Sequence, residues 1–106
     1  MPARGLAIIT SGLTASAGEQ AVIALRAAKR TRTFGEPTVS FTTGVEIIDL
    51  GNGLLFLYSA AFPVDVHHTA YRERVTPQVI MEGGDNFLDL AGDRKIIAAM
   101  KWLDEN

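Results

Sequence analysis

The chain has 106 residues, a length that favours a single domain over residues 1–106. Hydrophobic residues make up 47% and charged residues 21% of the sequence, as in globular proteins and unlike disordered chains. The formal net charge of −2 argues against a nucleic-acid-binding protein with a broad basic surface. The absence of cysteine excludes disulfides and thiolate metal sites, and no apolar run approaches the roughly 20 residues of a membrane span.

The first third of the chain predicts a strand, a helix and a second strand, the pattern of an α/β domain. Residues 5–10 are apolar and predict a buried strand. Residues 16–30 are rich in helix formers and predict a helix that is covered on most sides. Residues 31–34 predict a strand that enters a turn at residues 35–38.

The remainder predicts a β-hairpin and a last helix. The turn Gly51-Asn52-Gly53 joins predicted strands at residues 45–50 and 54–61, and residues 62–77 read as an exposed loop before a short strand at 79–81. The last helix begins at Asp89 or Asp93 and runs to about residue 104. Its predicted apolar face consists of Ile96, Ile97, Met100 and Leu103.

The amino terminus allows a second interpretation. Arg4, the mildly apolar stretch that follows and the small residues at 15–17 resemble an export signal. A buried strand followed by a turn explains the same residues, since Thr10, Ser11 and Gly12 interrupt the apolar stretch. The cellular compartment is therefore unknown from the sequence.

The most informative residues are the run Thr14-Ala-Ser-Ala-Gly-Glu19, after the first predicted strand. Small residues allow a sharp turn there, and a hydroxyl at the start of a helix lies beside unpaired N–H groups at the positive end of the helix dipole. This setting suits a serine nucleophile whose oxyanion needs hydrogen-bond donors. Serine is also a favoured N-cap, so the residues alone leave Ser16 as either a nucleophile or a helix cap.

Two motifs give a resemblance to a known family. Thr14-Ala-Ser-Ala-Gly-Glu19, a helix and then Arg32-Thr-Phe-Gly-Glu-Pro-Thr38 resemble the carboxy-terminal half of the tail-specific, or C-terminal processing, serine peptidases. The resemblance continues through the turn at residues 50–54 and Val75-Thr-Pro-Gln78, and covers nearly the whole chain. It implies a crotonase/ClpP-like α/β core fragment with a short strand, a nucleophile-bearing helix, a β-hairpin and a C-terminal helix.

The resemblance also implies roles for two residues. Ser16 takes the position of the nucleophile, and the N–H of Ala17 supplies one oxyanion donor. The implied function is the nucleophile-bearing part of a serine-type endopeptidase, which hydrolyses peptide bonds through an acyl-enzyme. Its partner is a peptide or protein substrate, and we expect no cofactor and no metal.

The chain departs from the family in its general base. The bacterial tail-specific branch places a catalytic Lys three residues after the Gly-Glu-Pro-Thr motif, where this chain has Phe41, so a Ser–Lys dyad of that kind is excluded. The sequence is closer to the branch without a PDZ insertion, which includes tricorn-like and nisin-resistance-type peptidases and uses a His upstream of the nucleophile. No His precedes Ser16, so we expect this chain alone to have little or no peptidase activity.

Other candidates have simpler explanations. His67 and His68, with Asp65 nearby, fit an internal triad with Ser16 or a metal site, but a solvated loop explains them as well. A basic cluster at the end of the first helix fits a solvated helix terminus; it comprises Arg26, Lys29, Arg30 and Arg32.

Two further hypotheses about function stay open. The chain could be a non-catalytic binding or oligomerisation module derived from the peptidase fold, or an unrelated α/β domain in which Ser16 only caps a helix. Half of a peptidase core should leave apolar surface uncovered. We therefore expect a homo-oligomer or docking to a missing amino-terminal half, with no nucleic-acid partner and no membrane span.

Overall fold

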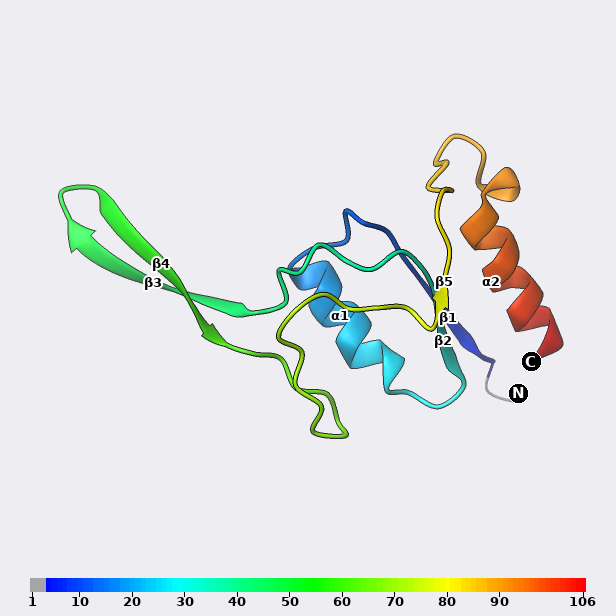
Figure 1. Ribbon diagram of the computed structural model, residues 1–106, viewed down its shortest axis with the longest axis horizontal. Helices are drawn as coiled ribbons and strands as arrows, with labels where there is room; N and C mark the ends of the chain where they lie inside the picture. The colour runs from blue at the N-terminus through cyan, green and yellow to red at the C-terminus, as the bar shows by residue number, and fades with distance from the viewer. Residues whose placement is uncertain (1–3) are drawn as a thin grey trace.

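The computed structural model describes residues 4–106 as an α/β body from which a two-stranded ribbon projects (Figure 1). The body is built on a parallel sheet in the order β1-β2-β5, formed by β1 (Leu6–Thr10), β2 (Thr31–Gly35) and β5 (Val79–Ile80). Helices α1 (Ala17–Arg26) and α2 (Arg94–Glu105) lie on opposite sides of this sheet (Figure 1). The expected α/β class is confirmed.

Strands β1 and β2 form a β-α-β unit with α1 between them. Their register runs from Leu6 opposite Thr31 to Thr10 opposite Gly35. Helix α1 ends at Arg26, earlier than predicted, because residues 27–30 turn back towards the sheet and Arg30 adopts a φ of 59°.

The expectation that α1 is covered on most sides is wrong. Only one of its faces packs, through the buried residues Glu19, Val22 and Ile23, whereas Leu25 is 47% exposed. The two apolar residues of this face form a core cluster with Ile8 of β1 and Val75, against which Tyr71 packs. Residues 62–77 were predicted to form an exposed loop. That prediction is wrong in part, because Val75 of this segment is buried in the core.

Helix α2 packs through a face that coincides with only half of the predicted one, since Ile96 and Leu103 are half-buried. Lys95 and Ala99 are buried, and Trp102, one turn further on, contacts Phe34 of β2 with 6.2 Å between ring centroids. By contrast, Ile97 and Met100 of the predicted face are 52% and 53% exposed. The sequence pattern failed here because a lysine, rather than an aliphatic residue, occupies the packed face.

The two candidate caps of the last helix cap different elements. The Asp93 carboxylate accepts hydrogen bonds from the N–H groups of Lys95 and Ile96 at the start of α2. The Asp89 carboxylate accepts from the N–H of Gly92 in the short 3-10 turn η1 (Leu90–Gly92). None of the helices within residues 4–106 is long and apolar enough to cross a bilayer.

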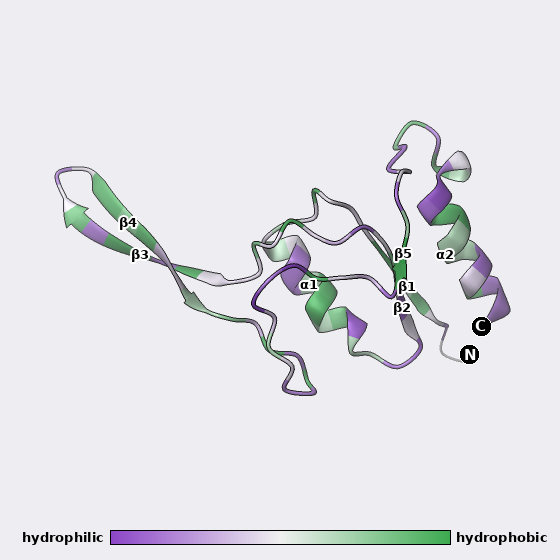
Figure 2. Ribbon diagram, viewed as in Figure 1, coloured by the Kyte–Doolittle hydropathy of each residue, from purple (hydrophilic) through white to green (hydrophobic). Residues whose placement is uncertain are grey.

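The predicted hairpin is confirmed as an antiparallel ribbon of β3 (Gly44–Gly51) and β4 (Leu54–Ala61). Asn52 and Gly53 form its turn with φ values of 52° and 77°, as the Asn-Gly signal predicted. The ribbon extends away from the body, and hydrophobic residues occupy most of its length (Figure 2). The radius of gyration is therefore 16.7 Å, against about 13 Å for a compact chain of this length.

Candidate functional site

Ser16 lies at the bend where the chain leaves β1 and enters α1. The preceding loop is closed by two contacts between Ser11 and Thr14: the Thr14 N–H donates to the Ser11 carbonyl, and the Ser11 N–H donates to Oγ1 of Thr14, both at 3.0 Å. The Ser16 backbone has φ 52° and ψ −117°, and its side chain is exposed. A residue other than glycine pays about 1–3 kcal/mol for such a conformation.

Ser16 stands beside hydrogen-bond donors of the helix terminus. Ala17 is the first residue of α1, so its N–H has no acceptor within the helix. The N–H of Gly18 instead donates to the Ala15 carbonyl at 3.0 Å. Ser16 and Ala17 therefore lie at the strand-to-helix bend where the sequence predicted them, at the positive end of the α1 dipole.

The carboxylate of Glu19 holds this bend against a distant segment. Glu19 is fully buried, and its Oε2 accepts hydrogen bonds from the N–H groups of Ser16 and Phe41, both at 2.8 Å. Its Oε1 accepts from the N–H of Ser40, also at 2.8 Å. The start of α1 is thereby fixed to the segment of residues 38–41.

The hydrogen bonds of Glu19 also set its charge. Burial acts to raise the pKa of this carboxyl, but the Thr38 hydroxyl and the N–H groups of Ser40, Ser16 and Phe41 outweigh burial and lower the pKa below its ordinary value. Glu19 is therefore ionised at neutral pH. The bond from the Ser16 N–H to Glu19 belongs to a capping box, and the spacing of these two residues is the sequence signal that could have indicated it.

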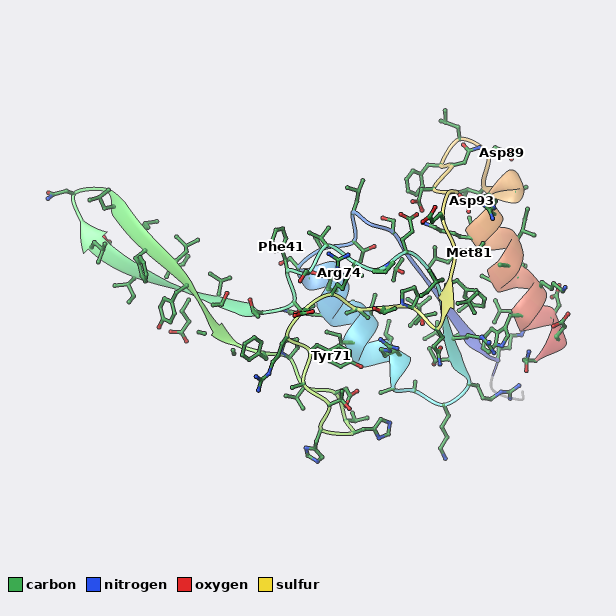
Figure 3. All side chains as sticks on the ribbon, viewed as in Figure 1. Phe41, Tyr71, Arg74, Met81, Asp89 and Asp93 are labelled. Atoms are coloured by element: carbon green, nitrogen blue, oxygen red, sulfur yellow. The ribbon has the colours of Figure 1, made fainter. Side chains whose placement is uncertain are left out.

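Phe41 lies close to the loop of residues 11–16, which we call the serine loop. In the bacterial branch of the resembled family, this position holds the catalytic lysine. The N–H of Val39 donates to the carbonyl of Thr14 at 2.9 Å, which aligns residues 38–41 beside the serine loop. The Phe41 side chain is 65% exposed and lies near the start of α1 (Figure 3). The backbone at position 41 is therefore held close to that of Ser16, because the N–H groups of both residues donate to Oε2 of Glu19.

The hydrogen bonds of Asp65, the carboxylate nearest the two histidines in the sequence, lie within the histidine loop and not at Ser16. His67 and His68 are exposed, and Asp65 accepts hydrogen bonds from the N–H groups of His67 and Thr69 and from the Tyr71 hydroxyl, all within the same loop. Within residues 4–106, no group of three or more His, Asp or Glu side chains has the arrangement of a metal site. The solvated-loop interpretation is the one that these contacts favour.

An ion-pair cluster centred on the buried Lys95 lies at the end of β2. The Nζ of Lys95 is 2.9 Å from Oε1 of Glu36 and 2.9 Å from Oδ2 of Asp85, and the Lys95 side chain is fully buried. Burial acts to lower the pKa of Lys95, but hydrogen bonds and charges from Asp85 and Glu36 outweigh it and raise the pKa. Lys95 is therefore a protonated structural cation and not a free base.

A cavity of about 280 Å³ opens between the serine loop, the residues before η1 and the start of α2. Ser11 and Thr14 contribute to its rim from the same loop that carries Ser16. Its other lining residues are mostly apolar and comprise Ile9, Thr10, Asp85, Phe87, Leu90, Asp93 and Ile96.

Comparison with known proteins defines the fold and no further property. No protein-family model matches the chain, and neither does any curated protein. A solved structure of a lipoprotein from Streptococcus agalactiae matches with a TM-score of 0.74 and 22% sequence identity. The match covers 95% of this chain and 32% of the lipoprotein, so the chain spans about a third of that protein's length.

Proposed function

We propose that the chain is the nucleophile-bearing part of a serine-type endopeptidase with a crotonase/ClpP-like core, in which Ser16 attacks the peptide carbonyl and forms an acyl-enzyme. The backbone conformation of Ser16 is the observation that carries the proposal. An N-cap serine typically has a β-region backbone, whereas Ser16, although it forms a capping box with Glu19, has φ 52° and ψ −117°. Strained residues of this kind gather at active sites, where a sharp strand-to-helix turn exposes the nucleophile.

The proposed chemistry divides between Ser16 and the helix terminus. As the Ser16 oxygen bonds to the carbonyl carbon, negative charge develops on the carbonyl oxygen, and the Ala17 N–H and the α1 dipole stabilise it. The proton of Ser16 must pass to a base. Phe41 offers none and Lys95 is already protonated and paired, so we propose that the chain alone lacks general-base help, which is typically worth about 10²–10⁴-fold in rate.

The neighbouring cavity supports a peptide as substrate. Its apolar lining fits an aliphatic or aromatic side chain, and its rim includes Ser11 and Thr14 of the serine loop. A peptide bound with such a side chain in the cavity would have its backbone near the serine loop.

The second candidate function is a non-catalytic binding or oligomerisation module derived from the same fold. The apolar β3–β4 ribbon favours it, since exposed apolar surface of this kind marks interaction sites. Chemical labelling of Ser16 separates the two functions, because a binding module needs no reactive serine.

A fluorophosphonate probe followed by peptide mapping tests the proposed nucleophile. We expect slow labelling at Ser16 that Ser16→Ala abolishes and that Ser11→Ala, a change in the same loop, leaves intact. Labelling spread equally over the serines, or absent from Ser16, would reject the nucleophile. Rapid labelling of the unmodified chain would contradict the proposal that the chain alone lacks a general base.

Installing a base sharpens this experiment. Phe41→Lys should raise the rate of Ser16 labelling by about 10- to 100-fold, with a dependence on the ionisation of the new amine. Leu13→Lys is the matched control, since Leu13 is 88% exposed in the serine loop and also gains a positive charge. Equal effects of the two lysines would assign the gain to charge alone, and labelling in neither variant would favour the non-catalytic module.

A further inference from the structure

Phe87 is an aromatic residue that solvent reaches over most of its surface. Its side chain is 81% exposed, and it lines the cavity beside the serine loop. Phenylalanine is among the residues most often buried in folded proteins, whereas exposed aromatic side chains at cavities are typical of ligand pockets. Phe87 therefore belongs to the wall of the cavity and not to the core.

The backbone that carries Phe87 is anchored to the start of α2. The Asp85 carboxylate accepts two hydrogen bonds from Nζ of Lys95, at 3.0 and 2.9 Å, and the N–H of Asn86 donates to Oδ2 of Asp93 at 2.6 Å. Asp93 lies at the start of α2, beside this loop (Figure 3). Phe87 thus follows two anchored residues, so the fold holds its backbone at the cavity although its side chain is exposed.

The size of the cavity favours one side chain as its occupant. Its volume is about 280 Å³, whereas pockets for whole small molecules measure about 300–1,000 Å³. Three elements contribute aliphatic side chains to the lining: Ile9 of β1, Leu90 of η1 and Ile96 of α2. Because Ser11 and Thr14 also line the cavity, a peptide with one side chain seated there passes the serine loop.

The charges of the lining decide which side chain is accepted. An acidic side chain would lose hydration beside the carboxylates of Asp85 and Asp93, which both line the cavity. A lysine side chain would find these carboxylates engaged, since both oxygens of Asp85 accept from Lys95 Nζ and both oxygens of Asp93 accept from backbone N–H groups. The lining therefore favours an uncharged, apolar side chain.

We infer that Phe87 is a specificity-determining residue, which covers one uncharged apolar side chain of the peptide substrate in this cavity. The ring and the bound side chain remove apolar surface of each other from water. The assignment rests on the proposed function, because that function makes the occupant part of a peptide. Binding can nevertheless be measured without any reaction, so the two can fail separately.

Blocked amino acids test the selectivity of the cavity. The probes are Nα-acetyl-leucinamide and the matching derivatives of lysine and of aspartate, whose side chain has nearly the shape of leucine. Each is titrated into the isotope-labelled chain and followed by nuclear magnetic resonance. The leucine compound should shift the amide signals of Ser11, Thr14 and Ile96 and bind at least about tenfold more tightly than the aspartate compound. Lysine binding as tight as leucine binding, or shifts spread evenly over the chain, would contradict the selectivity.

Two alanine variants test the residue itself. Leu88 is the matched control for Phe87, because it is adjacent, 100% exposed and not part of the cavity lining among the described residues. Since both side chains are exposed, both variants should keep the fold, which Trp102 fluorescence reports. Phe87→Ala should weaken binding of the leucine compound by at least about fivefold, and Leu88→Ala by less than about twofold. Equal effects of the two substitutions would overturn the role of Phe87.

Fluorophosphonate labelling of Ser16, measured on the same samples, separates this inference from the proposed function. Leucine binding without labelling would reject the nucleophile and leave the pocket in place. Labelling of Ser16 without binding of the leucine compound would reject the pocket and leave the nucleophile in place.

Discussion

The backbone N–H groups of Ser16 and Phe41 donate to one oxygen atom, Oε2 of Glu19, each at a distance of 2.8 Å. The two amides therefore lie within twice a hydrogen-bond length of each other, although they are 25 positions apart in the chain. The carboxylate between them is fully buried, so water cannot replace it. Glu19 is thus a positioning residue, which orients the start of α1 against residues 38–41.

Glu19→Gln should destabilise the protein by about 2–4 kcal/mol. A glutamine keeps one acceptor oxygen but places an NH₂ group where backbone donors converge, so at least one buried N–H loses its acceptor. Urea unfolding followed by Trp102 fluorescence measures the change. Glu105→Gln, the same substitution at an exposed position of α2, should stay within about 0.5 kcal/mol, and equal effects of the two would contradict the assigned role.

The same carboxylate predicts how stability depends on pH. The pKa of Glu19 is lowered in the folded state from its ordinary value of 4.5. Its contribution to stability is therefore complete above that value and is lost as the pH falls through the lower, folded-state pKa. Urea midpoints between pH 3 and pH 7 should fall steeply at the acid end. In Glu19→Gln this fall should be shallower; an unchanged slope would assign it to other carboxyls, such as Asp93, whose pKa is also lowered.

Local sequence signals predicted most of the elements of the fold. The strand before Ser16, the strand entering Gly35 and the hairpin around Asn52-Gly53 all follow from short-range patterns of apolar and turn residues. The start of α1 was also predictable, since a capping-box spacing lies within four consecutive residues. The end of α1 was not, because the left-handed conformation of Arg30 depends on how the chain re-enters the sheet.

The contacts that the sequence missed are those between distant segments. Glu19 bonds to residues 38–41, and Lys95 pairs with Glu36 and Asp85, and no local pattern indicates either. The error at α2 has the same origin. Hydrophobic periodicity assumes that a charged residue faces solvent, but two carboxylates draw Lys95 into the packed face and turn Ile97 outwards.

Two substitutions of Ser16 separate backbone strain from helix capping. Ser16→Gly should raise the free energy of unfolding by about 1 kcal/mol, because glycine adopts a φ of 52° without strain. Ser16→Ala keeps the strain and removes the hydroxyl, so it should be neutral or destabilising by up to about 1 kcal/mol. Urea unfolding of the serine protein and its two variants gives their order of stability. A glycine variant less stable than the serine protein would indicate an ordinary cap and remove the main support for a nucleophile.

Gly35→Ala should disrupt the junction between β1 and β2. Gly35 has a φ of 128°, and a Cβ atom at this position would clash with the Thr10 carbonyl oxygen. The two strands would have to separate, so we expect a loss of more than about 3 kcal/mol or no folded protein. Gly44→Ala is the control, because its Cβ would meet no atom closer than 3.7 Å. Similar circular dichroism melting curves for the two variants would contradict the packing of β1 on β2.

Lys95→Met should weaken the attachment of α2 to the end of β2. The substitution removes the cation between Glu36 and Asp85 and leaves two carboxylates facing each other, but both are about one-third exposed and water can reach them. We therefore expect a loss of about 1–3 kcal/mol, below the cost of breaking a fully buried pair. Lys101→Met, on the exposed side of the same helix, should change stability by less than about 0.5 kcal/mol.

The pH dependence and a double variant distinguish the ion pairs of Lys95 from its packing. The pKa of Lys95 is raised above 10.5 in the folded state, so its stabilising contribution is complete below that value and is lost as the pH rises through the folded-state pKa. Lys95→Met should therefore flatten the alkaline limb of the stability profile. Adding Glu36→Gln to Lys95→Met should recover part of the lost stability by removing one of the two facing charges. Additive losses in urea unfolding of the double variant would instead mean that the aliphatic packing of Lys95, and not its charge, holds α2 on the sheet.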